Sequence, residues 1–194
     1  GLPPALDATP MGRPLYAKLG FVEVCEMTRW RREAGLPYGA GAPGRPAAAA
    51  ENAEPAPGGF RPCTSLQEAI RRDAAAAGCE RAALFEGFRH RDGTAMWCGP
   101  GDTVAVLRRG RAAWQVGPVV AGAGALNEAL SLAIAHSGAA ALVVDSFDEN
   151  EAAAAALSRA GFSRVRTFTR MVYGAAAFPW SLESVAAVAG PEYG

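Results

Sequence analysis

The sequence contains few of the residues that several classes of function require. Lys18 is its only lysine and its formal net charge is zero, which argues against a general polyanion-binding protein. His90 and His136 are the only histidines, and no two cysteines form a C-x-x-C pair, so no zinc-binding pattern can be assembled. No apolar run is long enough to cross a bilayer, and no signal peptide is recognisable. We therefore expect a cytoplasmic protein with no metal ion and with neither nucleic acid nor membrane as a partner.

The four cysteines, Cys25, Cys63, Cys79 and Cys98, lie far apart, and we expect them to be reduced, buried thiols. Half of the 194 residues are apolar, which is enough to build a substantial core. The chain begins with Gly1 rather than Met, and its first residues already have the character of a domain interior. We therefore expect the start of a domain to be missing.

Proline and glycine recur every few residues between positions 33 and 62, a composition typical of a linker. A brief helix over residues 47–53 is an alternative, because alanine favours helix there. Before the linker, the pattern predicts a helix over 13–19, closed by Gly20, and a strand over 21–29. We place the domain boundaries at 1–32, 33–62 and 63–194.

Residues 63–194 predict an α/β (α+β) domain with a mixed central sheet flanked by helices. Thr64 or Ser65 begins a helix that Gly78 ends, with Gln67 or Glu68 as capping-box partner. The other expected helices cover 81–88, a segment ending at 136, and 149–159, the last capped by Asp148. The expected strands cover 94–98, 103–107, 112–117, 140–145, 162–173 and, as a possible last antiparallel strand, 184–189.

Residues 113–125, AWQVGPVVAGAGA, predict a strand that opens into a glycine-containing turn and then a helix. The N-terminus of a helix presents unpaired N–H groups and the positive end of the helix dipole. This corner could therefore bind a phosphate or pyrophosphate group. The alternative is an ordinary tight connection, since short glycine motifs are weakly specific.

An internal repeat relates the two ends of the chain. A shift of 141 positions, without a gap, aligns a helix, a Gly-Phe corner and a strand, which implies the same supersecondary unit twice. The aligned pairs are Asp7 with Asp148, Gly20 with Gly161, Phe21 with Phe162, Val24 with Val165, Thr28 with Thr169, and Arg29 with Arg170.

These residues resemble the GNAT superfamily of N-acetyltransferases. The sequence LYAKLGF at 15–21 is similar to the end of the family helix that leads into its penultimate strand. The order of elements in 63–194, with Val116–Val120, Gly161-Phe162 and Phe168–Met171, resembles the C-terminal domain of bacterial tandem-GNAT proteins. The resemblance implies that residues 1–32 are the last helix and strand of a first GNAT domain and that 63–194 form a complete second one.

The resemblance implies an acyl-CoA site in a V-shaped opening between two central strands. In the family, backbone N–H groups of a Q/R-x-x-G-x-G/A loop hold the pyrophosphate. Here Val119 stands at the Gln/Arg position, so we expect weaker binding through backbone donors alone. The cofactor-binding residues that the resemblance implies are Val119, Val120, Gly122, Ala123, Gly124, Ala125 and, from its N-x-x-A motif, Asn150.

The resemblance also implies a general acid that protonates the leaving CoA thiolate. Tyr16 occupies that tyrosine position in the first copy, whereas the second copy has Leu157, which cannot donate a proton. We therefore expect an enzyme that transfers the acetyl group of acetyl-CoA directly to a primary amine of a small molecule or peptide, with Tyr16 as the acid. Alternatively, Tyr16 only packs a helix face and Asn150 is only a first-turn polar residue.

Two other functions remain open from the residues. The second domain could be a non-catalytic module that shapes the substrate cleft or senses acyl-CoA, as Leu157 and the missing Gln/Arg suggest. A dinucleotide site at AGAGA is less compatible with the hairpin strands that precede it.

Overall fold

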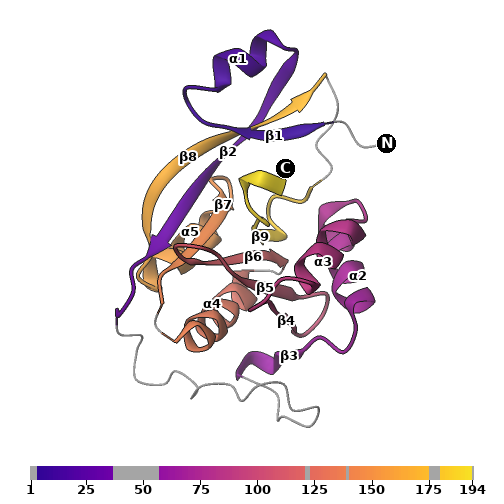
Figure 1. The fold of residues 1–194 in the computed structure, drawn as a ribbon, viewed down its shortest axis with the longest axis vertical. Helices are drawn as coiled ribbons and strands as arrows, with labels where there is room; N and C mark the ends of the chain where they lie inside the picture. The colour runs from indigo at the N-terminus through magenta and orange to yellow at the C-terminus, as the bar shows by residue number, and fades with distance from the viewer. Residues whose placement is uncertain (1–3, 37–56, 121–122, 139, 175–179, 194) are drawn as a thin grey trace.

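The computed structural model describes residues 4–36, 57–120, 123–138, 140–174 and 180–193 (Figure 1). The predicted helix over 47–53 and most of the predicted linker lie outside these residues. The strands are β1 (Ala5–Ala8), β2 (Phe21–Arg32), β3 (Arg61–Pro62), β4 (Ala95–Cys98), β5 (Val104–Arg109), β6 (Trp114–Val120), β7 (Leu142–Phe147), β8 (Ser163–Tyr173) and β9 (Val185–Ala187). The helices are α1 (Arg13–Lys18), α2 (Leu66–Ala77), α3 (Ala82–Arg89), α4 (Ala123–Ser137) and α5 (Glu151–Arg159), with short 3-10 turns η1 (Pro57–Gly59) and η2 (Pro191–Tyr193).

The described strands form one nine-stranded mixed sheet, as the predicted fold class requires. Its order is β1-β8-β2-β7-β6-β5-β4-β3, and β9 pairs with β6 outside this path. The β6–β7 pair is parallel, and the other described pairs are antiparallel. Because β2 lies between β7 and β8, the two sequence segments predicted as separate copies share one sheet (Figure 1).

The core has two parts because side chains of a strand alternate between the faces of the sheet. Along β5, Ala105 and Leu107 belong to a cluster with residues of α4 and α5, whereas Val104 and Val106 belong to a cluster with residues of α2 and α3. Helices therefore cover both faces of this half of the sheet (Figure 1).

Local capping agrees with the sequence for α2 but not for α5. The Ser65 side chain accepts a hydrogen bond from the Glu68 N–H, and Gly78 ends α2 in the left-handed region at φ 64°. For α5, the predicted Asp148 cap is wrong: Asn150 is the N-cap, and its Oδ1 accepts a hydrogen bond from the Ala153 N–H at 2.9 Å. The helix therefore begins two residues later than expected.

The prediction of four reduced thiols is also wrong. Cys63 and Cys98 form a disulfide, whereas Cys25 is a free buried thiol and Cys79 is free and partly exposed. The register of β3 and β4, which pairs Arg61 with Cys98, brings the two Cα atoms to 5.1 Å. That distance suits a disulfide, but it follows from a strand pairing that the cysteine spacing does not reveal.

A pseudo-two-fold axis relates the repeated units. In the antiparallel β2–β8 pair, Met27 faces Phe168. These two positions are 141 residues apart, so each is the repeat counterpart of the other. The partners on either side obey the same exchange, since Glu26 pairs with Thr169 and Thr28 with Thr167. Following the predicted repeat, we call β1, α1 and β2 the first copy, and residues 63–194 the second copy.

The strand pairing around this axis changes one of the aligned pairs of the predicted repeat, the pair of Asp7 with Asp148. Asp7 on β1 pairs with Arg170, and Asp145 on β7 pairs with Arg29, the counterpart of Arg170. The structural counterpart of Asp7 is thus Asp145 rather than Asp148. The gapless alignment fails there because the connection from β1 to the Gly-Phe corner is shorter than the connection from β7.

Candidate acyl-CoA cleft and acid residue

The candidate cleft lies where β6 and β7 diverge. The two strands pair in parallel from Trp114 with Leu142 to Val116 with Val144, and β9 then lies beside β6 in antiparallel pairing. A hydrogen bond of 2.8 Å from the Val188 N–H to the Asp145 carbonyl joins the same segment to β7. The opening between the two central strands therefore contains the chain's own C-terminal segment.

Val119 and Val120 are both buried at the end of β6. Each residue pairs with β5 on one edge of β6 and with β9 on the other. Their main chain is therefore in the interior of the sheet, and it does not present the open row of donors expected for a bound thioester.

The predicted phosphate loop is only partly described. Gly122 lies outside the described residues. Ala123, Gly124 and Ala125 form the first turn of α4, and Ala125 packs against the core cluster shared with α5. A helix N-terminus therefore follows β6, as the sequence predicts.

Asn150 is buried, and both ends of its amide have partners. Its Oδ1 caps α5, and its Nδ2 donates to the carbonyls of Leu182 and Glu183 at 3.2 and 3.3 Å. The side chain therefore connects α5 to the segment that leads into β9.

Tyr16 lies on α1, away from α4 and the end of β6 (Figure 1). Its half-buried ring packs edge-on against Phe21 at 5.8 Å between centroids, and Phe21 in turn contacts Tyr173 at 5.4 Å. At the equivalent position of α5, Leu157 is fully buried. The structure thus does not bring Tyr16 together with the predicted cofactor-binding residues of the second copy.

Two pockets lie near these elements. One of about 570 Å³ lies at the β1–α1 turn, and its lining includes Thr9, Met11, Thr28 and Arg166. A smaller one of about 210 Å³ borders the end of β6 at Val120. The larger of these two pockets therefore lies between the copies, because residues 164–167 of β8 line it together with the β1–α1 turn and Thr28 of β2.

The sequence analysis missed two bidentate ion pairs, one on each side of the pseudo-two-fold axis. Arg170 donates to Asp7 at 2.6 and 2.7 Å, and Arg29 donates to Asp145 at 2.8 Å through two nitrogens. Burial raises the pKa of Asp7, and the hydrogen bonds from Arg170 oppose that rise. The repeated arginines were a visible signal, but their partners depend on the pairing of strands from different copies.

Comparison with known proteins shows which protein family has this mixed sheet with diverging central strands. The family described as acetyltransferase (GNAT) domain matches residues 69–185, which is more than half of the chain. The chain belongs to the GNAT acetyltransferase family. No curated protein gives a significant match to the sequence.

Solved structures support the same fold. A Pyrococcus horikoshii protein assigned as an acetyltransferase has a TM-score of 0.68 at 19% identity, over 96% of this chain and 58% of its own. A GCN5-related N-acetyltransferase from Sphaerobacter thermophilus has a TM-score of 0.54 at 14% identity, over 89% of this chain and 61% of its own. This chain thus spans little more than half the length of these two proteins.

Within the described ranges, no three His, Cys, Asp or Glu side chains are grouped so that they could hold a metal ion. No helix in this part of the chain has the length and hydrophobicity needed to span a membrane.

Proposed function

We propose that this protein is an N-acetyltransferase that transfers an acetyl group from acetyl-CoA to a primary amine of a small molecule or peptide. A neutral amine nitrogen would attack the thioester carbonyl directly, a C–N bond would form, and the C–S bond would break. The Tyr16 hydroxyl would give the departing thiolate its proton, and the proton that the amine nitrogen loses on forming the amide would restore that hydroxyl through solvent. Family membership supports the reaction class, and Tyr16 is the observation that assigns the acid to the first copy.

The test of this function uses the complete gene product that contains these residues. Acetyl-CoA and a panel of primary amines should release free thiol together with acetylated amine, whereas acetyl-CoA alone should release little. Titration calorimetry should show binding of acetyl-CoA and none of NAD. Binding of NAD alone would favour the dinucleotide alternative, and binding of neither would favour a structural module.

Two leucine side chains on α1 are exposed, whereas the equivalent positions of α5 are buried. Leu15 and Leu19 are 58% and 56% exposed, whereas Ala156 and Ala160, their counterparts at an offset of 141, are 1% and 8% exposed. In the second copy these positions belong to the core that includes residues of β6 and α4. We propose that a strand-turn-helix unit equivalent to β6 and α4, N-terminal to residue 4 in the same polypeptide, covers this face.

The double substitution Leu15→Glu and Leu19→Glu distinguishes a covered from a free α1 face. In the 194-residue chain we expect the free energy of unfolding to change by no more than about 0.5 kcal/mol, because both residues are more than half exposed. In the complete gene product we expect a loss of about 2 kcal/mol or more, because burying carboxylates is costly. Urea unfolding measures both values. The matched control is Leu36→Glu, which should have no effect in either protein, and equal small effects of the double substitution in both would contradict the proposed covering unit.

The structure of the second copy favours an architectural role over a catalytic one. Leu157 is buried and offers no proton, and β9 lies along the main chain that a thioester would contact. We propose that the second copy contributes to the architecture of the enzyme and that the chemistry belongs to the first copy.

A further inference from the structure

The segment that contains β9 connects both sides of the opening between β6 and β7. On the β6 side, Val119 pairs with Ala187 and Val120 with Val185. On the β7 side, the Val188 N–H donates to the Asp145 carbonyl at 2.8 Å, and the Ser146 hydroxyl donates to the Ala186 carbonyl at 2.9 Å. The segment therefore satisfies hydrogen-bonding groups of both diverging strands.

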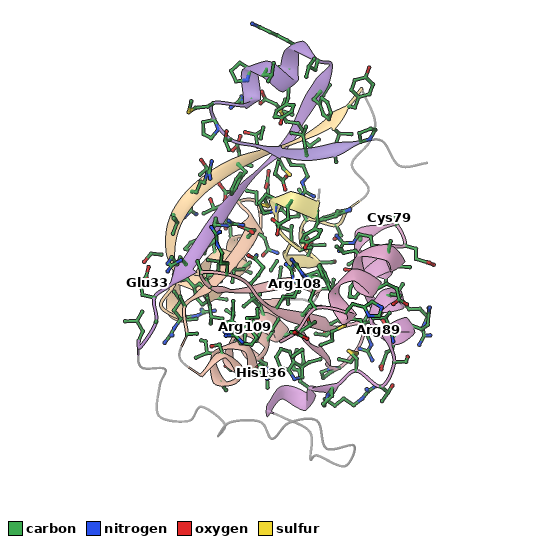
Figure 2. All side chains as sticks on the ribbon, in the orientation of Figure 1. Glu33, Cys79, Arg89, Arg108, Arg109 and His136 are labelled. Atoms are coloured by element: carbon green, nitrogen blue, oxygen red, sulfur yellow. A yellow bond between two sulfur atoms is a disulfide. The ribbon has the colours of Figure 1, made fainter. Side chains whose placement is uncertain are left out.

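Side chains hold this segment at both of its ends. Before β9, the Asn150 amide donates to the carbonyls of Leu182 and Glu183. After β9, the guanidinium of buried Arg108, which is labelled in Figure 2, donates to the Ala189 carbonyl. The same guanidinium stacks on Phe88 at 4.2 Å from the ring centroid. Asn150 is the N-cap of α5 and Arg108 lies on β5, so two different parts of the fold hold the segment.

The contact between the segment and β6 leaves no space at the main chain. A Cβ atom added to Gly117 would clash with the Val188 carbonyl oxygen, so the two backbones are in direct contact there. All five residues from Val185 to Ala189 are at most 2% exposed. An extended thioester arm along this edge of β6 would have to take the place of these residues.

We propose that residues 181–189 are a permanent occupant of the acyl-CoA cleft of the second copy, which therefore does not bind acyl-CoA. Removing them would leave main-chain groups of β6 and β7 and the Arg108 guanidinium without partners and would expose a row of apolar side chains. This cost favours a closed cleft over a segment that opens for each ligand. The inference concerns the second copy alone and stands whether or not Tyr16 acts as the acid.

The substitutions Val119→Cys and Ala187→Cys test this proposal in the 194-residue chain. The two positions face each other in the antiparallel register and both side chains lie in the same core cluster, which suits a cross-link. Mild oxidation, checked by mass spectrometry, would join β9 to β6, and reduction would release it. The matched control is Val119→Cys alone under the same oxidation.

The readout of the cross-linking experiment is acetyl-CoA binding, measured by calorimetry, so no acetyl-transfer assay is needed. A permanent occupant predicts that the cleft binds no acetyl-CoA in the cross-linked, reduced or unsubstituted chain, so the cross-link should change any affinity measured for another site by less than twofold. Binding that falls tenfold or more on cross-linking and returns on reduction would overturn the proposal.

A second measurement covers the case in which the double variant does not fold. Hydrogen exchange of the unsubstituted chain should show protected amides at residues 185–188, with the same protection in the presence of acetyl-CoA. Faster exchange of these amides when acetyl-CoA is added would show that the ligand displaces the segment, and would overturn the proposal.

Discussion

Replacement of Arg170 by methionine is expected to lower the free energy of unfolding by about 3–5 kcal/mol, because it leaves a buried carboxylate without its partner. The side chains of Arg170 and Asp7 are both fully buried and are joined by two short hydrogen bonds. Burial already raises the pKa of Asp7 despite these bonds, so removal of the guanidinium should favour the protonated acid further. Urea unfolding at neutral pH measures the loss.

The pseudo-two-fold axis supplies the matched control, Arg29→Met. Arg29 makes the equivalent ion pair, but its side chain is 27% exposed, and Asp145 keeps a hydrogen bond of 3.0 Å from the Gln115 amide. We expect this variant to lose about 1–2 kcal/mol, because solvent weakens the pair and the remaining carboxylate is still partnered. If both variants lost the same free energy of unfolding, burial would not determine how much each ion pair contributes to stability.

The substitution Tyr16→Phe is expected to lower kcat of the complete gene product about 100-fold, the lower end of what a positioned general acid contributes. The KM for acetyl-CoA should change by less than twofold, because the ring and its contact with Phe21 are retained. A thioester whose thiol is a better leaving group should reduce the difference, since its departure needs less help from an acid. Steady-state thiol release with both thioesters measures these effects.

Tyr173→Phe is the control for this substitution. Tyr173 contacts the same Phe21 ring from the other side, and it is 53% exposed. We expect kcat to change by less than twofold, since this hydroxyl has no assigned role. If Tyr16→Phe also left kcat unchanged, Tyr16 would be a packing residue and the acid would have to be sought elsewhere.

Local patterns predicted most of the elements, because the interactions that define them lie within a few residues. The Ser65 cap and Gly78 end of α2 follow from side-chain and backbone preferences at those positions. The two Gly-Phe corners repeat in the structure as they do in the sequence, with Gly20 and Gly161 at φ 91° and 82°, a region that favours glycine. Helix spacing likewise placed Tyr16 and Leu157 at equivalent positions of α1 and α5.

The order of the strands was decided by tertiary structure alone. The sequence pattern predicts strands over residues 21–29 and 184–189, but it does not specify their neighbours, because pairing depends on main-chain hydrogen bonds that any residue except proline can make. For this reason the insertion of β2 between β7 and β8, the Cys63–Cys98 disulfide and the buried Asp7–Arg170 pair were not predicted. Local spacing predicted the elements, and the motifs around the two Gly-Phe corners carried the resemblance to the family, whereas only the long-range pairing of β9 with β6 placed the chain itself in the opening between β6 and β7.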